Sequence, residues 1–271
     1  MRLAVTVAPA DAERAVAEAC ATLGTGCRQR AAPGGEALLD FWVAEAAADP
    51  DGLRALLAAA GIPARVEAVP EDDRWRDALR DFHRPVEIAG RLLVRPPWSP
   101  ARPPLLDVVV DPGMAFGTGQ HATTRSCLEL LARLAAEAPG ASALDAGCGS
   151  GVLAIAARRL GLDPVWALDA DPLCVEATLA NARRNGVGLR VARRAIGADR
   201  LPAADLVLAN LTGGLLRALA AALPEPAPRA LVASGMRPEE VPGVEGAMRA
   251  RGLRAVRRID ADGWSTLLVA R

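Results

Sequence analysis

The stretch of sequence that decides the fold is Ala143-Leu144-Asp145-Ala146-Gly147-Cys148-Gly149-Ser150-Gly151. A short apolar approach leads to an acid, and three glycines follow at alternate positions. The next residues, 152–160, are rich in Ala, Ile, Leu and Arg and predict a helix. Glycine is needed where a backbone turns tightly or where a ligand must approach it closely, and the N-terminus of a helix offers unpaired N–H groups. The pattern therefore predicts a strand, a ligand-binding turn and a helix.

The spacing of the glycines distinguishes two classes of cofactor. A loop that binds the pyrophosphate of a dinucleotide reads G-x-G-x-x-G, whereas this loop reads G-x-G-x-G, with Asp145 two residues before the first glycine. A carboxylate there repels a pyrophosphate but suits a ligand that carries an ammonium and a sulfonium. We therefore expect S-adenosylmethionine (SAM) to bind at Asp145, Gly147, Gly149 and Gly151. The alternative is a glycine-rich turn without a cofactor, as in many α/β proteins.

A second acid supports the cofactor site. Residues 165–169 predict a strand that ends in Asp169, 22 residues after Gly147. An acid about 20 residues beyond such a loop holds the ribose hydroxyls in α/β nucleotide sites, so we assign that role to Asp169. Asp171-Pro172 then predicts a helix start, with Asp171 as N-cap and the proline at the first helical position. Asp171 is therefore expected to have a structural role.

Composition limits the class of protein. The chain has 271 residues, a formal net charge of zero and a pI near 6.8, so no basic field for nucleic acid is implied. We find no uninterrupted apolar stretch of transmembrane length and no signal peptide at the N-terminus. The five cysteines form no C-x-x-C pair, which favours reduced thiols and no metal site. We expect a cytoplasmic monomer that binds neither nucleic acid nor membranes.

Residues 1–70 predict a separate small domain. Strand and helix patterns follow one another in the order βαββαβ, which is the order of a ferredoxin-like α+β domain. No catalytic cluster appears in it, so we interpret it as a substrate-recognition domain, with a packing or dimerisation module as the alternative. Residues 71–100 are expected to form a linker helix, with Trp75, Leu79 and Phe82 at near-helical spacing, and two short strands.

A loop rich in Gly and Thr, residues 111–124, precedes a helix expected over 125–136. A structureless loop of this length inside a compact domain is usually functional. We expect it to cover the cofactor, with Phe116 lining the methyl-transfer pocket and Thr124 bonding to SAM. His121 is expected to order the loop or to lie at the acceptor site, and Thr123 or Thr124 to cap the helix. The alternative is a glycine-rich surface crossover with an exposed histidine.

Strands and helices alternate from residue 141 onward, which predicts an α/β domain over 101–271 with a mostly parallel sheet that ends in a hairpin. Strands are expected near 141–146, 165–169, 189–193, 204–210, 229–234, 254–260 and 264–270. This arrangement suits the seven-stranded, Rossmann-like fold of SAM-dependent methyltransferases.

Ligands of such open sheets bind beyond the carboxyl ends of the strands. Asn210 lies at such an end, and its side chain with the Leu211 carbonyl provides two acceptors that could hold an amine for methylation. The alternative is that Asn210 caps the helix that starts at Thr212.

Several motifs together resemble one family. They are Asp111-Pro112-Gly113-x-Ala115-Phe116-Gly117-Thr118-Gly119-x-His121-x-Thr123-Thr124, the glycine loop, Asp169-x-Asp171-Pro172, Ala209-Asn210-Leu211 and Ser234-Gly235. In this order they look like the signature of the PrmA family, the bacterial ribosomal protein L11 methyltransferases among the class I SAM-dependent enzymes. The match is specific over residues 71–271, whereas residues 1–70 are similar only in length and layout.

The resemblance implies SAM-dependent methylation of lysine ε-amines and the N-terminal α-amine of ribosomal protein L11, which the N-terminal domain would bind. It implies cofactor contacts at Thr124, Gly147, Asp169 and Asn210. Three other functions remain open: a lysine methyltransferase of another protein, a small-molecule N-methyltransferase, and a SAM-binding ribosome-interaction factor without activity. The segment after Asn210 lacks the aromatic residue of Asn-Pro-Pro-Tyr enzymes, which counts against planar base substrates.

Overall fold

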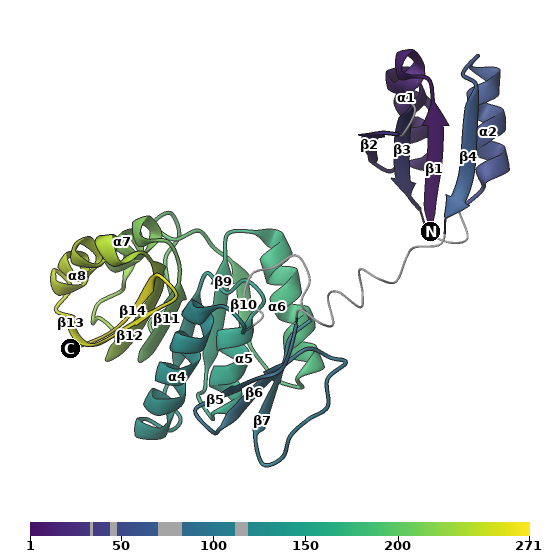
Figure 1. The fold of residues 1–271 in the computed structure, drawn as a ribbon. Helices are drawn as coiled ribbons and strands as arrows, with labels where there is room; N and C mark the ends of the chain where they lie inside the picture. The colour runs from purple at the N-terminus through teal and green to yellow at the C-terminus, as the bar shows by residue number, and fades with distance from the viewer. Residues whose placement is uncertain (33–34, 44–47, 70–82, 112–118) are drawn as a thin grey trace. The chain divides into compact units, whose positions relative to one another are not determined.

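The computed structural model describes residues 1–32, 35–43, 48–69, 83–111 and 119–271. The chain divides into two compact units, Met1–Ala78 and Leu79–Arg271 (Figure 1). Each unit has its own hydrophobic core, and each is described by itself. None of the helices in the described ranges is long and apolar enough to cross a membrane.

The first unit is one antiparallel sheet with two helices. Its strands lie in the order β2-β3-β1-β4, and the order of strands and helices along the chain is the predicted one. Its elements are β1 (Arg2–Val7), the short 3₁₀ helix η1 (Pro9–Asp11), α1 (Ala12–Leu23), β2 (Cys27–Ala31), β3 (Ala37–Trp42), α2 (Pro50–Ala59) and β4 (Ala64–Val69).

The core of the first unit follows from the alternation of its strands. Side chains two residues apart lie on one face of a strand, and Leu3 and Val5 of β1 are buried beside Leu39 and Phe41 of β3. Asp40, between the last two, is also buried, at 1% exposure. Its carboxylate forms ion pairs with the guanidinium groups of two neighbouring strands, those of Arg2 at 3.1 Å and of Arg30 at 2.7 Å.

The second unit is built on a seven-stranded mixed sheet, and all seven predicted strands are confirmed. The strand order is β10-β9-β8-β11-β12-β14-β13. The pairs that β14 forms with β12 and β13 are antiparallel, and all other pairs are parallel. The strands are β8 (Ala143–Ala146), β9 (Val165–Asp169), β10 (Arg190–Arg193), β11 (Leu206–Asn210), β12 (Ala230–Met236), β13 (Arg254–Ala261) and β14 (Trp264–Ala270). This is the α/β fold that the sequence predicts for a methyltransferase domain.

Helices cover both faces of this sheet, and each face has its own hydrophobic core. One core includes side chains from α4 (Ala122–Glu137) and α5 (Val152–Arg159), with α6 (Pro172–Arg184) packed along β9 and β10. The other core includes side chains from α7 (Gly213–Ala222) and α8 (Val241–Arg249), which follows the short 3₁₀ helix η3 (Pro238–Glu240). The loops that follow the carboxyl ends of the parallel strands lead into the helices on the two faces.

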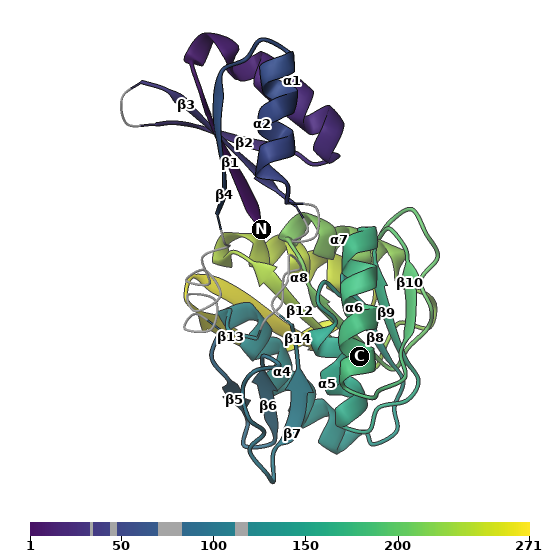
Figure 2. The ribbon, with the colours of Figure 1, turned by 90° about the vertical axis from the view of Figure 1, so that its right-hand side faces the viewer.

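A smaller sheet completes the second unit. Its three strands are β5 (Val86–Ile88), β6 (Leu92–Arg95) and β7 (Leu106–Val109), and they lie beside α4 and α5 (Figure 2). Ile88, Leu92 and Val108 are buried in the same core as α4 and α5. The two short strands expected before residue 100 are therefore packed into the second unit. The linker helix expected over 72–82 lies outside the described residues.

Candidate active site

The glycine loop follows β8 and is tied to the end of β9. Gly147, Gly149 and Gly151 all have positive φ, at 79°, 54° and 82°, a backbone conformation that favours glycine. The N–H groups of Gly147 and Cys148 donate to the Leu168 carbonyl at 2.8 and 3.0 Å. A Cβ on Gly147 would overlap the Leu211 side chain. The loop therefore lies at the carboxyl edge of the sheet in a backbone conformation, and in contact with Leu211, that only glycine permits.

Asp145 is buried beneath this loop with half of its carboxylate unpaired. The residue is 1% exposed. Its Oδ2 accepts a hydrogen bond from the Ala154 N–H at 3.1 Å, whereas Oδ1 has no hydrogen-bond partner among the described residues. Burial raises the pKa of Asp145 to about 7, against the opposing effect of the Ala154 N–H, and the charge of Asp169 adds to the rise. A cationic donor brought to this carboxyl would relieve the cost of its burial.

Asp169 ends β9 next to the glycine loop, as the sequence predicts. Its Oδ2 accepts from the Gly149 N–H at 2.9 Å and its Oδ1 from the Asp171 N–H at 3.1 Å. Asp171 in turn caps α6, because its Oδ1 accepts from the Leu173 N–H at 2.9 Å. The predicted cap at Asp171 is confirmed, and the structure places Asp169 in contact with the loop whose ligand it is expected to share.

Asn210 ends β11, and its amide is oriented by two threonines. Nδ2 donates to the hydroxyl oxygens of Thr123 and Thr124 at 3.1 and 3.3 Å, while no described residue donates to Oδ1. The alternative role of Asn210 as a helix cap is wrong, because α7 begins at Gly213 with Thr212 as its N-cap residue. The side chain is therefore fixed by its donor end, and its acceptor end is available.

The Leu211 carbonyl and the Asn210 side chain border the same small space. Gly235, in β12, has a φ of 86°, and a Cβ built on it would lie 2.6 Å from the Leu211 oxygen and 2.9 Å from Asn210 Oδ1. The Leu211 N–H donates to the Ser234 carbonyl at 2.8 Å. Glycine at position 235 thus lets β12 approach the two oxygens that the sequence predicts to hold an amine.

The start of α4 differs from the prediction. The helix is capped by His121, whose Nδ1 accepts from the Thr123 N–H at 3.4 Å, rather than by Thr123 or Thr124. The helix begins three residues before the predicted start, at Ala122, because the threonine hydroxyls bond to Asn210 and His121 takes the cap position. Thr124, predicted to bond to SAM, is fully buried at its contact with Asn210. Phe116, predicted to line the methyl-transfer pocket, lies outside the described residues.

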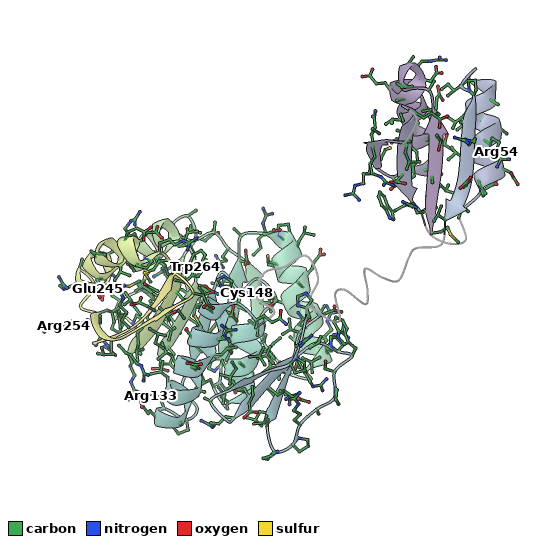
Figure 3. The ribbon with its side chains drawn as sticks, viewed as in Figure 1. Arg54, Arg133, Cys148, Glu245, Arg254 and Trp264 are labelled. Atoms are coloured by element: carbon green, nitrogen blue, oxygen red, sulfur yellow. The ribbon has the colours of Figure 1, made fainter. Side chains whose placement is uncertain are left out.

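Trp264, which the sequence analysis did not select, lies against His121. The two ring centroids are 5.4 Å apart at an interplanar angle of 70°, and the Arg237 guanidinium lies 4.0 Å from the Trp264 ring centroid. Because β14 runs antiparallel to β12, its first residue lies at the carboxyl end of the parallel strands. Trp264 and the loop residue Cys148 are labelled in Figure 3. A tryptophan directly after a predicted hairpin turn was the sequence signal for this position.

Buried polar residues of α6 were also missed. Thr178, Asn181 and Asn185 are all at most 4% exposed and share one face of the helix. Thr178 Oγ1 lies 3.0 Å from the Gly149 carbonyl oxygen, to which it donates. Their spacing of three and four residues on the face that must pack on the sheet was the available signal.

A family model and curated relatives point to the same family. The family model that matches residues 51–271 is described as ribosomal protein L11 methyltransferase (PrmA). A protein of that name from Symbiobacterium thermophilum is 38% identical over 225 residues, covering 80% of this chain and 72% of the relative. One from Rhodopseudomonas palustris is 41% identical over 238 residues, covering 82% and 79%.

A solved structure is similar over much of the chain. The crystal structure of a ribosomal protein L11 methylase from Lactobacillus delbrueckii subsp. bulgaricus has 28% sequence identity and a TM-score of 0.61. The match covers 70% of this chain and 99% of that one.

Proposed function

The chain belongs to the PrmA family of ribosomal protein L11 methyltransferases, and we propose that it transfers methyl groups from SAM to lysine ε-amines and the N-terminal α-amine of ribosomal protein L11. The observation that carries this proposal is the oriented amide of Asn210. Its donor end is bound by Thr123 and Thr124, so its Oδ1 and the Leu211 carbonyl face one space as two acceptors. Two fixed acceptors suit an amine, which donates hydrogen bonds.

The residues around the glycine loop fit SAM. Asp145 offers an unpaired carboxylate oxygen to a cationic group, and three loop glycines with positive φ leave the loop backbone without side chains, so that a ligand can approach it closely. Asp169 lies where a ribose is held in α/β nucleotide sites. Asp145, Gly147, Gly149, Gly151 and Asp169 would therefore hold the cofactor, and Thr124 would support it through Asn210.

When bound, SAM supplies an electrophilic methyl group on a sulfonium. Asn210 Oδ1 and the Leu211 carbonyl accept hydrogen bonds from the amine and orient its lone pair, and this alignment can supply roughly 7–11 kcal/mol in favourable cases. The amine must first be neutral, which at pH 7 costs about 4–5 kcal/mol for a lysine and about 1 kcal/mol for an α-amine. The proton leaves to solvent before capture. His121 acts by capping α4 and so fixing Thr123 and Thr124.

The first unit is proposed to recognise the protein substrate. Its strand order, read as β4-β1-β3-β2, with two helices on a four-stranded antiparallel sheet, supports a ferredoxin-like domain over residues 1–70. Trp42 is 40% exposed at the end of β3, beside a groove of about 770 Å³ between α1 and α2. An exposed tryptophan beside a groove suits the anchor of a protein interface. Residues 71–100 connect this domain to the catalytic domain, 101–271, and strands β5 and β6 of this segment pack on the catalytic domain. The protein acts as a cytoplasmic monomer without binding nucleic acid.

Mass spectrometry of ribosomal protein L11 after incubation with this chain and SAM tests the function. We expect mass additions in whole methylene units, lost when SAM is omitted. The chain contains no lysine, so self-methylation is confined to its N-terminus. Peptide mapping then assigns the modified amines.

Other results would identify the rival functions. Transfer to a different lysine-containing protein, but not to L11, would indicate another protein substrate. SAM binding without any transfer would indicate an interaction factor.

A further inference from the structure

One buried amide joins the glycine loop to the end of β7. Asn181 of α6 is 3% exposed. Its Nδ2 donates to the Ser150 carbonyl at 2.9 Å, and its Oδ1 accepts from the Asp111 N–H at 3.1 Å. Both ends of the side chain are therefore used, one on the cofactor loop and one on the residue that opens the Gly- and Thr-rich motif of the family.

The neighbours of Asn181 on the same helix face make the attachment continuous. On the N-terminal side, Thr178 donates to the Gly149 carbonyl at 3.0 Å. On the C-terminal side, the Asn185 side chain donates to the Val109 carbonyl at 2.6 Å and accepts from the Val109 N–H at 2.8 Å. The Thr178 hydroxyl therefore bonds to the loop, and the Asn185 side chain bonds to the strand and to the Asn181 carbonyl. Asn181 is the residue of this face whose side chain bonds to both the loop and the segment after β7.

The contact with Asn181 adds to the order of a loop that is rich in glycine. Three of its five residues from Gly147 to Gly151 are glycines, which lose more conformational freedom on ordering than any other residue. Hydrogen bonds to the Gly149 and Ser150 carbonyls fix the direction of those peptide groups, and with it the direction in which the loop N–H groups point. Ordering the loop before the ligand arrives removes an entropic cost from binding.

We propose that Asn181 is a positioning residue for the cofactor, which sets the Ser150 peptide of the glycine loop in its binding orientation and ties it to Asp111. The identity of the ligand rests on the proposed function. Asp111 is held a second time from the same helix, because Arg184 forms an ion pair with its carboxylate at 3.0 Å. Loss of the Asn181 donor therefore acts mainly on the loop, while Asp111 keeps its contact with α6.

The test compares two substitutions that remove one amide donor each from the same helix face. Asn181→Asp keeps the acceptor for Asp111, removes the amide donor to the Ser150 carbonyl and places a carboxylate oxygen beside it. Asn185→Asp keeps the acceptor for the Val109 N–H and removes the Nδ2 that donates to the Val109 and Asn181 carbonyls, and it makes no direct contact with the glycine loop. Both amides are nearly fully buried, at 3% and 4% exposure, so a general loss of stability is expected from each.

Binding of S-adenosylhomocysteine by calorimetry, with thermal unfolding of each variant, separates the roles. We expect Asn181→Asp to weaken binding about tenfold, since it removes a buried hydrogen bond and sets a carboxylate against the Ser150 carbonyl oxygen, and to raise the KM for SAM with kcat within about twofold. Asn185→Asp should lower the melting temperature with affinity unchanged. Asn181→Ala, which adds no charge, should weaken binding in the same direction.

Three results would overturn the proposal. The first is wild-type affinity in folded Asn181→Asp or Asn181→Ala. The second is an equal loss of affinity in Asn185→Asp, which would show that the helix acts only through general stability. The third is the absence of binding by the wild-type chain, which would overturn the proposed cofactor as well; the first two leave that cofactor intact.

Discussion

Two aspartates, one in each unit, are equally buried and differently compensated. Asp40 on β3 and Asp145 on β8 are each 1% exposed. Asp40 forms ion pairs with Arg2 and Arg30, although its Oδ1 accepts no hydrogen bond from a described residue. Asp145 accepts from one backbone N–H and, among the described residues, its Oδ1 has neither a hydrogen bond nor an ion pair. A buried carboxylate that the protein itself compensates is part of the fold. One that it leaves half compensated indicates a site for a ligand.

The largest effect is expected when the compensated carboxylate is removed. Asp40→Ala leaves two guanidinium groups facing a buried position, and removal of one partner from a buried pair costs about 3–5 kcal/mol. Because both arginines are partly exposed, we expect the lower end, about 3 kcal/mol. Urea unfolding measures this change. The control is Glu36→Ala, which breaks the exposed Arg65 pair and should cost at most about 1 kcal/mol; equal costs would contradict the contrast.

The next largest effect concerns Asn210 at the carboxyl edge of the large sheet. Its amide donates to two hydroxyls, but its Oδ1 accepts no hydrogen bond from the described residues. Asn210→Ala removes the oriented acceptor but leaves β11 and the two threonine hydroxyls in place. We expect kcat to fall about 100-fold, the loss seen when one preorganised hydrogen-bonding group is removed from an active site. Initial rates of methyl transfer measure it, and a cooperative urea-unfolding transition is the control for folding. Wild-type turnover would exclude this role for Asn210.

Substitution of Asp145 should affect the free energy of unfolding in a different way from substitution of Asp40. Asp145→Asn removes the charge offered to the cofactor, and a hydrogen bond to a charged group is worth about 1.5–3 kcal/mol. We expect cofactor affinity to fall about tenfold or more, while the free energy of unfolding near pH 8 is unchanged or higher, since a neutral amide costs less to bury. Calorimetry and urea unfolding measure the two quantities. Reduced stability with full affinity would reverse the comparison.

The smallest effect, taken per pH unit, is a dependence of stability on pH. The pKa of Asp145 is raised to about 7 in the folded chain, so between about pH 4 and 7 the folded state holds a proton that the unfolded state has lost. The free energy of unfolding therefore falls as pH rises through this range, by up to about 1.4 kcal/mol per pH unit from this group. Urea midpoints from about pH 5 to 8 should show this slope in the wild-type chain without cofactor. The slope should be shallower in Asp145→Asn.

The sequence predicted the parts of the site that depend on local chemistry. The glycine loop, the strand ends at Asp169 and Asn210, and the cap at Asp171 follow from residue types within a few positions of one another. The seven strands of the large sheet could also be predicted, because their apolar runs are bounded by turn residues. Local conformational preference and the final packing agree at these positions.

The parts that were missed depend on contacts between distant segments. The cap of α4 was assigned to a threonine, since threonine is a strong N-cap residue, but the Thr123 and Thr124 hydroxyls bond to Asn210, 87 and 86 positions away. Asn181 looks like an ordinary helix residue until Ser150 and Asp111 are placed beside it. Sequence spacing does not show which polar group of a helix finds a buried partner in another segment.

The position of Leu211 between two glycines constrains how this protein can change. Its side chain fills the space that a Cβ on Gly147 would need, and its carbonyl lies where a Cβ on Gly235 would fall. A larger residue at Gly147 clashes unless the side chain at position 211 changes as well, whereas at Gly235 the clash is with backbone atoms of residue 211, which no substitution there removes. Positions 147 and 211 should therefore be inherited as a pair, and position 235 should remain glycine. A laboratory library that aims to alter the acceptor must vary residue 211 first.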